Sequence, residues 1–85
     1  MDSVGATAVD IQESLLQDFG SRLRQMRKVR RLRQMDMAAF GLSYKYYQRI
    51  EAGQVNPTLL TMHRLASAFD VSVYDFFRPQ AQADA

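Results

Sequence analysis

The chain has 85 residues, of which 47% are hydrophobic, and it contains no cysteine. This apolar content suffices for one modest core but not for two, and the lack of thiols excludes disulfides and thiolate metal ligands. No run approaches the roughly 18 apolar residues that a membrane span needs, and the N-terminus lacks the basic start and apolar run of a signal peptide, so we expect a cytoplasmic protein with no membrane partner.

Basic residues are concentrated in one part of the sequence. Residues 22–49 contain nine basic residues and a single acid, Asp36, which gives this segment a net charge of +8. The rest of the chain has two basic and eight acidic residues, a net charge of −6. This uneven distribution favours a polyanion as partner. Arginines that merely solvate a helix face are the alternative, and charge alone does not decide between the two.

The N-terminal third predicts a short arm followed by helix. Residues 1–8 are small and aperiodic and are expected to form a mobile arm, with order beginning near Val9. Gly20 leaves two possibilities open, namely helices over about 10–18 and 19–31, or one long helix at a cost of about 1 kcal/mol. Apolar residues in this region recur at three- and four-residue intervals, which predicts one buried stripe: Ile11, Leu15, Leu16, Phe19, Leu23 and Met26.

Two short helices are predicted next, on either side of a turn. Residues 34–40 contain several apolar side chains and suit a short buried helix that ends at Gly41. Ser43 has the hydroxyl of an N-cap for a helix over residues 44–52. Gly53 fits the left-handed position that follows the end of that helix.

A fourth helix is predicted after a turn formed by Asn56, Pro57 and Thr58, with Thr58 or a neighbour as its cap. Its apolar face is expected to bury Leu59, Leu60, Met62, Leu65, Ala66 and Phe69.

Ser72 and Asp75 resemble a capping pair, which predicts a last short helix that starts after Ser72 and ends at Arg78 and Pro79. This helix carries Val73, Tyr74, Phe76 and Phe77. Residues 79–85 are small and polar and are expected to fray. With no strand pattern in the sequence, the prediction is an all-α fold with one domain over residues 9–78.

Residues 34–52 follow the order short helix, Gly-Leu-Ser turn, short helix, which is typical of a DNA-reading helix-turn-helix. In the second helix, Tyr47 and Ile50 are expected to face the core. The side chains left to project outward all donate hydrogen bonds and suit base edges or phosphates in a major groove: Tyr44, Lys45, Gln48 and Arg49.

Five segments follow one another between Phe19 and Phe77: FGSRLRQMR, QMDMA, GLSYKYYQRIEAG, NPTLLTMHRLASAF and VSVYDFF. In the order and spacing of these segments the chain resembles the phage-repressor and Cro-type helix-turn-helix family, often called the Xre family. The resemblance implies a compact, lambda-repressor-like bundle of about five short helices, usually as a twofold dimer on pseudo-palindromic DNA.

The resemblance also implies roles for particular residues. By position, Tyr44, Lys45 and Arg49 fall at base edges, Gln34 at a phosphate, and Tyr46 and Asn56 near further contacts to the DNA backbone. Arg27 and Glu51 are implied to pair within the fold and to contribute to its stability. The full set of expected DNA-contacting residues is Gln34, Ser43, Tyr44, Lys45, Tyr46, Gln48, Arg49 and Asn56.

The sequence departs from the family pattern around residues 34–40. Arg31 stands where a helix-ending glycine is usual, so the first helix is expected to overrun its end. Arg33 replaces the usual capping residue. The spacing from Ala38 to Gly41 is one residue shorter than usual, which implies a lost part of a turn or a remodelled bend.

These features predict a sequence-specific transcriptional regulator, most simply a repressor, with double-stranded operator DNA and a second copy as partners. No cofactor, metal site or catalytic residue is expected, since His63 has no nucleophile, acid or second ligand arranged around it. The alternative is an antitoxin or another protein-interaction module that docks a protein through its C-terminal aromatics. Four C-terminal side chains fit either a core or a dimer interface: Val71, Val73, Phe76 and Phe77.

Overall fold

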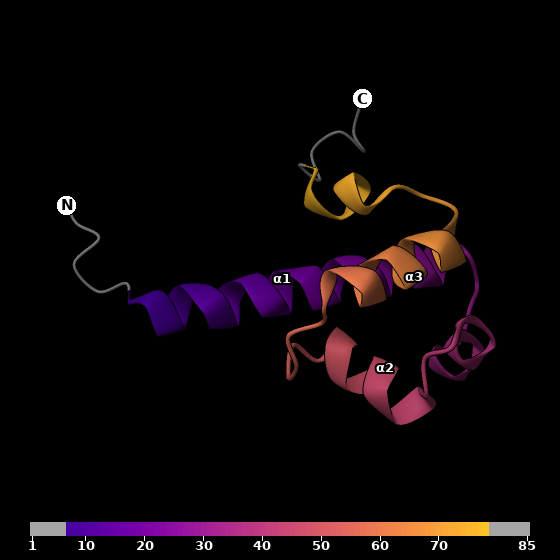
Figure 1. Ribbon diagram of the computed structural model, residues 1–85, viewed down its shortest axis with the longest axis horizontal. Helices are drawn as coiled ribbons and strands as arrows, with labels where there is room; N and C mark the ends of the chain where they lie inside the picture. Colours follow the sequence, from indigo (N-terminus) through magenta and orange to yellow (C-terminus); the bar gives the residue numbers. More distant parts are fainter. Residues whose placement is uncertain (1–6, 79–85) are drawn as a thin grey trace.

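The computed structural model describes residues 7–78, which form three α-helices and two 3-10 helices and no strand (Figure 1). In chain order these are α1 (Ala8–Val29), η2 (Gln34–Phe40), α2 (Tyr44–Glu51), α3 (Leu59–Phe69) and η3 (Val73–Phe77). The predicted all-α bundle is confirmed, although its first helix is 22 residues long rather than short.

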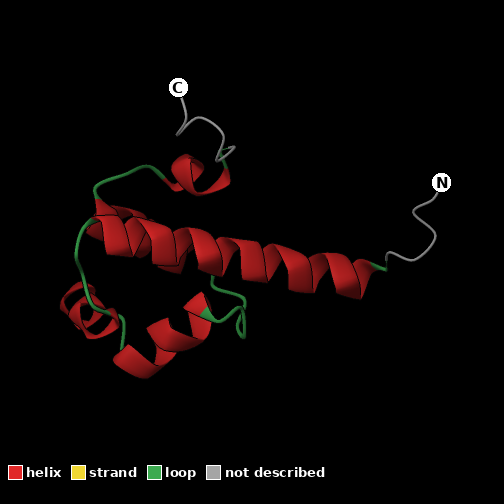
Figure 2. Cartoon of the chain, turned by 180° about the vertical axis from the view of Figure 1, so that it is seen from behind, coloured by secondary structure: helices red, strands yellow, loops and turns green. Residues whose placement is uncertain are grey.

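The long helix α1 runs through the middle of the arrangement. Helices α2 and η2 lie on one side of it and η3 lies on the other, as the view from behind also shows (Figure 2). None of the helices within residues 7–78 is long and apolar enough to cross a membrane. The frayed tail expected at residues 79–85 and the first six residues of the expected arm lie outside the described part of the chain.

Helix α1 begins at Ala8, one residue earlier than the sequence predicted, and Thr7 caps it. The Thr7 hydroxyl accepts the backbone N–H of Asp10 at 3.1 Å, and the Asp10 carboxylate accepts the backbone N–H of Thr7 at 3.4 Å. This reciprocal pair satisfies two donors at the start of the helix. The expectation of a mobile arm is therefore wrong for Thr7 and Ala8.

Gly20 does not interrupt α1. A Cβ atom at this position would lie 2.3 Å from the backbone carbonyl oxygen of Glu51 and 2.8 Å from that of Ile50. Glycine therefore allows the C-terminal end of α2 to approach α1 more closely than any side chain would permit.

The core lies where the C-terminal part of α1 meets the other four helices. Its buried apolar residues are Phe19, Leu23, Met37, Leu42, Tyr47, Ile50, Leu65, Ala66, Phe69 and Phe76. The buried stripe predicted for α1 is thus only partly correct, since Ile11 and Leu15 are 60% and 56% exposed. They lie in the first turns of α1, which extend beyond the bundle (Figure 1).

Thr58 caps α3 as predicted, and its hydroxyl accepts the backbone N–H of Thr61 at 3.1 Å. The expected burial of Leu59 and Leu60 is wrong, because the buried face of α3 is confined to Leu65, Ala66 and Phe69, toward the other end of this helix.

Segment η2 is a 3-10 helix that Gly41 ends with a φ of 84°. Because a 3-10 helix rises about 2.0 Å per residue against about 1.5 Å in an α-helix, it spans a given distance with fewer residues. This geometry accommodates the short spacing before Gly41. The prediction of a buried helix holds only for Met37, since Met35 and Phe40 are 49% and 40% exposed.

Asp36 supplies the cap that Arg33 lacks. Its carboxylate accepts the backbone N–H of Arg33 at 2.7 Å and the Arg33 guanidinium at 3.0 Å. These hydrogen bonds lower the pKa of the Asp36 carboxyl. The start of η2 is therefore fixed from its third residue rather than from the residue before it.

Arg31 ends α1 in the left-handed conformation that glycine usually adopts. Its φ is 58°, its backbone N–H donates to the carbonyl of Lys28 at 2.9 Å, and the N–H of Leu32 donates to that of Arg27 at 3.1 Å. These two bonds form a Schellman motif. The expected overrun of α1 is therefore wrong, because Arg31 tolerates the backbone conformation that stops the helix.

Replacing Arg31 with glycine is expected to stabilise the fold by about 1 kcal/mol, since the left-handed conformation strains a residue that has a Cβ. Thermal or urea unfolding measures the change. Arg24→Gly, within the same helix, serves as the control and should cost about 1 kcal/mol. If Arg31→Gly is less stable than the wild type, the arginine side chain stabilises the fold by more than its left-handed backbone conformation destabilises it.

Candidate nucleic-acid interface

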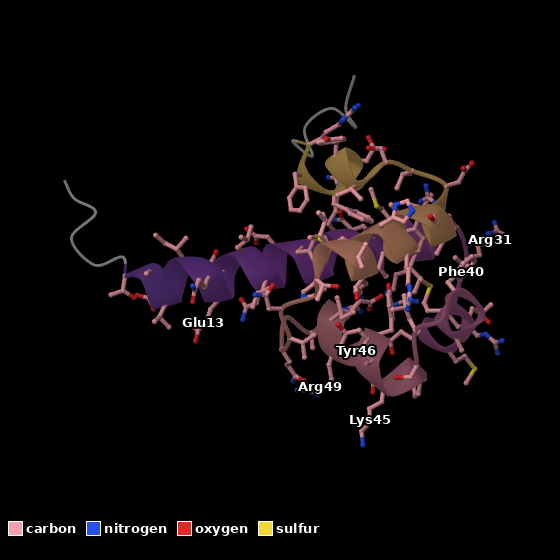
Figure 3. All side chains as sticks on the ribbon, in the orientation of Figure 1. Glu13, Arg31, Phe40, Lys45, Tyr46 and Arg49 are labelled. Carbon is pink, nitrogen blue, oxygen red and sulfur yellow. The ribbon has the colours of Figure 1, made fainter. Side chains whose placement is uncertain are left out.

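Helix α2 is anchored by one face and exposed on the other. Ser43 caps it as predicted, because the Ser43 hydroxyl accepts the backbone N–H of Tyr46 at 3.2 Å. Tyr47 and Ile50 are 0% and 1% exposed, so the predicted inward face is confirmed. The four residues expected to project are exposed, and Figure 3 shows two of them, Lys45 and Arg49, pointing away from the bundle.

The outward residues of α2 form two rows, because residues four apart lie one above the other on a helix. Tyr44 and Gln48 form one row, in which the Gln48 amide donates to the Tyr44 hydroxyl at 3.3 Å. Lys45 and Arg49 form the second row. The surface thus combines a hydrogen-bonding pair of neutral side chains with a pair of cations.

Three other residues predicted to contact DNA are not part of the outward face of α2. Tyr46 is half-buried and packs against the core, and Asn56 is exposed in the loop before α3. The half-buried Gln34 amide donates to a carboxylate oxygen of Glu51 at 2.9 Å. The side chain of Gln34 is therefore engaged within the fold, and its phosphate contact stays a prediction.

A buried ion pair supports α2 from behind. Arg27 donates through Nε to Oε2 of Glu51 at 2.5 Å and through Nη2 to Oε1 at 3.1 Å, and the two side chains are 10% and 5% exposed. Nη1 of Arg27 also donates to the carbonyl of Leu32 at 2.9 Å. With the bond from Gln34, one carboxylate joins α1, η2 and α2, and the implied pairing of Arg27 with Glu51 is confirmed.

The surroundings keep Glu51 ionised. Burial opposes the charged form, but hydrogen bonds from Arg27 and Gln34 outweigh it and lower the pKa of the Glu51 carboxyl. The hydrogen bond to Glu51 raises the pKa of Arg27 in turn. Burial, and then the Glu51 carboxylate, raise the pKa of the Tyr47 hydroxyl, so this side chain stays neutral.

Two further arginines of the basic segment also serve the fold. Arg30 donates to the carbonyls of Phe69 and Met26, both at 2.9 Å, and its guanidinium lies 5.4 Å from the centre of the Phe69 ring. Arg22 donates to the carbonyl of Asp75 at 2.9 Å. Sequence reasoning missed these roles, because nothing in a run of arginines indicates which of them reaches a distant carbonyl.

Six further basic residues of the segment 22–49 are exposed. They lie in or just after α1, just before η2, or on α2: Arg24, Lys28, Arg31, Arg33, Lys45 and Arg49. Arg31 and the exposed Phe40 lie at the η2 end of the molecule (Figure 3). Neither was among the residues predicted to contact DNA. The exposure of Arg31 depends on where α1 ends, which the sequence did not predict correctly, whereas Phe40 was expected to be buried and is 40% exposed.

The C-terminal cluster divides between core and surface. Phe76 is 4% exposed and packs edge to face with Phe19 at 5.4 Å between ring centroids, so of the two alternatives left open for it the core is the one observed. Val71 and Val73 are half-buried against the core. Phe77 stacks on Phe19 at 5.9 Å and is 55% exposed, so it remains accessible.

Residues 18–75 match the family described as a helix-turn-helix domain. Since this match covers more than half of the chain, the protein belongs to the helix-turn-helix family, of the phage-repressor and Cro type.

Two proteins to which the chain is similar are consistent with this assignment. The HTH-type transcriptional regulator DdrOP3 of Deinococcus deserti is 42% identical over 55 residues, which are 64% of this chain and 43% of the relative. The chain therefore spans less than half the length of that regulator. The crystal structure of the restriction-modification controller protein C.AhdI from Aeromonas hydrophila matches with a TM-score of 0.73 and 35% identity, over 75% of this chain and 98% of that protein.

Proposed function

We propose that this protein binds double-stranded DNA sequence-specifically through α2 and regulates transcription. The observation that carries the proposal is the outward face of α2, where two rows of hydrogen-bond donors stand on a helix whose opposite face is buried. A major groove about 12 Å wide admits such a helix with its side chains. The similarity to a transcriptional regulator and to a controller protein supports the same function.

The chemistry of the two rows suits base edges. Lys45 and Arg49 match the O6 and N7 acceptors of guanine, Gln48 matches adenine, and Tyr44 suits a thymine methyl group or a phosphate. Side chains four residues apart on a helix are about 5–6 Å apart, whereas base pairs stack about 3.4 Å apart. The two side chains of a row are therefore between one and two base-pair steps apart along the DNA.

Phosphate contacts would supply most of the affinity. Lys45 and Arg49 of α2 and the exposed basic residues that precede this helix in the sequence lie within residues 22–49, which carry a net charge of +8. Ser43, Tyr46, Asn56 and Gln34 are the further candidates for contacts to the DNA backbone. Binding is then salt-sensitive, and occlusion of a promoter is its simplest regulatory output.

A docking module for another protein is the second candidate function. The exposed aromatic side chains Tyr74 and Phe77, at 78% and 55% exposure, favour it. The burial of Phe76 reduces the surface that such a partner would contact. The outward donors of α2 have no role in that function, so we favour DNA binding.

Replacing Arg49 with alanine is expected to weaken binding to the preferred site by about 1–3 kcal/mol and to relax the preference at one base position. Selection of bound sequences from a random duplex library at fixed salt measures both effects. Arg49→Lys is the matched control, because it keeps the charge but not the planar fork that contacts guanine at two points.

In that selection, Arg49→Lys should retain salt-dependent binding while losing preference at the same base position. If Arg49→Ala selects the same bases at every position as the wild type, Arg49 does not recognise a base. A wild-type protein that enriches no duplex at low salt would overturn DNA binding altogether.

A further inference from the structure

Two neutral side chains on the outward face of α2, Tyr44 and Gln48, are hydrogen-bonded to each other. Nε2 of Gln48 donates to the Tyr44 hydroxyl at 3.3 Å. Both side chains remain open to a ligand, since Gln48 is exposed and Tyr44 is 47% exposed. The direction of this bond decides which groups Gln48 has left to offer.

A glutamine that nothing holds recognises more than one base. Its terminal torsion is broad and roughly twofold, so the amide oxygen and nitrogen exchange places easily. With two N–H groups forward, the amide suits guanine, which has the acceptors O6 and N7 in the major groove. With the oxygen and one N–H forward, it suits adenine, which has the donor N6 and the acceptor N7.

The bond to Tyr44 selects the second of these arrangements. One N–H of the Gln48 amide is used by the Tyr44 hydroxyl, so one N–H and the carbonyl oxygen are left. These two groups match N7 and N6 of adenine. Guanine would instead place its O6 against the carbonyl oxygen of Gln48, and two acceptors that face each other leave both without a hydrogen bond.

A DNA phosphate would fix the bond in the observed direction. The Tyr44 hydroxyl has one hydrogen to donate and lone pairs with which to accept. Phosphate oxygens only accept, so a hydroxyl that donates to a phosphate has only its lone pairs left for Gln48. The amide must then turn an N–H toward Tyr44, as it does in the structure. Tyrosine suits this task because its side chain has only two torsions and a rigid ring.

We propose that Tyr44 is a positioning residue for Gln48: held by a phosphate of the DNA backbone, it orients the amide so that Gln48 recognises adenine and rejects guanine. The inference rests on the proposed function and deepens it. At 3.3 Å the bond is long for N–H···O, so water competes with it in the free protein. A closed groove excludes this water and strengthens the bond.

The test compares the wild type, Tyr44→Phe, Gln48→Ala and the double variant in selection from a random duplex library at fixed salt. The wild type should prefer adenine to guanine at least about fivefold at the position that Gln48 contacts. Tyr44→Phe keeps the ring but lacks the hydroxyl, and it should lower this ratio about two- to tenfold. Gln48→Ala should abolish the preference, and adding Tyr44→Phe should then change nothing at that position.

Tyr74→Phe is the matched control. It makes the same substitution at a tyrosine that is 78% exposed on η3, on the other side of α1 from α2, and it should select the same bases as the wild type (Figure 1). A wild type that selects guanine at the Gln48 position, or an unchanged ratio in Tyr44→Phe, would overturn the proposal. So would a preference that Tyr44→Phe relaxes where Gln48→Ala does not, because Tyr44 would then contact a base itself.

NMR spectra of the free protein test the hydrogen bond without DNA. The side-chain amide protons of Gln48 should shift in Tyr44→Phe, where only the hydroxyl is lost, and should not shift in Tyr74→Phe. Unchanged Gln48 resonances in Tyr44→Phe would overturn the proposal while leaving DNA binding by α2 intact. A protein that shows the shift but enriches no duplex would overturn DNA binding and, with it, the recognition of adenine.

Discussion

Gly20→Ala is expected to destabilise this protein by at least about 2 kcal/mol, although alanine is the better helix former by about 1 kcal/mol. The added Cβ would lie 2.3 Å from the carbonyl oxygen of Glu51, and both atoms belong to helices that are held by the core. Rotation of a side chain cannot relieve a clash with a backbone oxygen, so α1 and α2 must separate.

Thermal unfolding measures the effect, since 1 kcal/mol corresponds to about 4–8 °C in a domain of this size. Ser21→Ala is the control, because Ser21 is the next residue of α1 and is exposed, and its replacement should change stability by less than about 0.5 kcal/mol. A melting temperature for Gly20→Ala equal to that of the wild type would mean that the two helices do not approach closely in solution.

The separation of α1 from α2 should also affect binding. The ion pair between Arg27 and Glu51 bridges the same two helices close to Gly20, so a shift of α2 tilts its outward face. DNA affinity of Gly20→Ala, measured well below its melting temperature, is therefore expected to fall even though no outward side chain has changed.

Helix ends were predictable from the sequence where local backbone chemistry decides them. The hydroxyls of Ser43 and Thr58 accept N–H groups only three residues away, and Gly53 supplies the left-handed turn after α2 with a φ of 73°. These signals lie within a few residues of the feature that they determine. The bounds of α2 and the start of α3 were accordingly predicted within one residue.

Features that depend on distant segments were not predictable in this way. Periodicity indicated an apolar row on α1 but not which part of it another element covers, so Ile11 and Leu15 were assigned to the core. Gly20 was interpreted as a possible break in the helix. The contact that requires a glycine there is made with the end of α2, thirty residues further along the chain. Arg31 was expected to let α1 overrun, whereas it ends α1 in a left-handed conformation that arginine alone disfavours, just before Leu32, which packs against the core.

In the candidate site, too, features set by neighbouring residues were predictable and those set by distant segments were not. The outward face of α2 followed from helical geometry once Tyr47 and Ile50 were assigned to the core. Gln34 was predicted at a phosphate, but its amide bonds a carboxylate that another helix supplies, which no local pattern indicates. Side chains that project from a helix are thus easier to predict than those that bridge two elements.

Removal of the Glu51 carboxylate is expected to have the largest effect of any single change at a charged residue. Glu51→Ala leaves the Arg27 guanidinium buried without its counter-ion, and breaking a buried pair in this way typically costs about 3–5 kcal/mol. It also removes the acceptor of the Gln34 amide. Urea unfolding measures the loss, and Glu13→Ala, at an exposed glutamate on α1, is the control that should change little (Figure 3).

The same carboxylate should make stability depend on pH in acid. Because the pKa of Glu51 is lowered from its ordinary value of 4.5, its contribution is fully present above pH 4.5 and is lost as the pH falls through the lower pKa of the folded state. The pKa of Arg27 is raised, so that residue stays charged throughout. Glu51→Gln should therefore flatten the loss of stability below pH 4.5, apart from the part due to Asp36, whose pKa is also lowered.

A double replacement distinguishes the net contribution of the Arg27–Glu51 ion pair to stability from the loss of stability when only one of its charges is removed. Arg27→Met combined with Glu51→Leu removes both charges and fills a similar volume, and such exchanges of buried ion pairs are often neutral or stabilising. We expect the double variant to recover most of the stability lost in Glu51→Ala while the Gln34 amide remains without its acceptor. A double variant as unstable as Glu51→Ala would show that the carboxylate matters for its bonds across three helices, rather than as the counter-ion of Arg27.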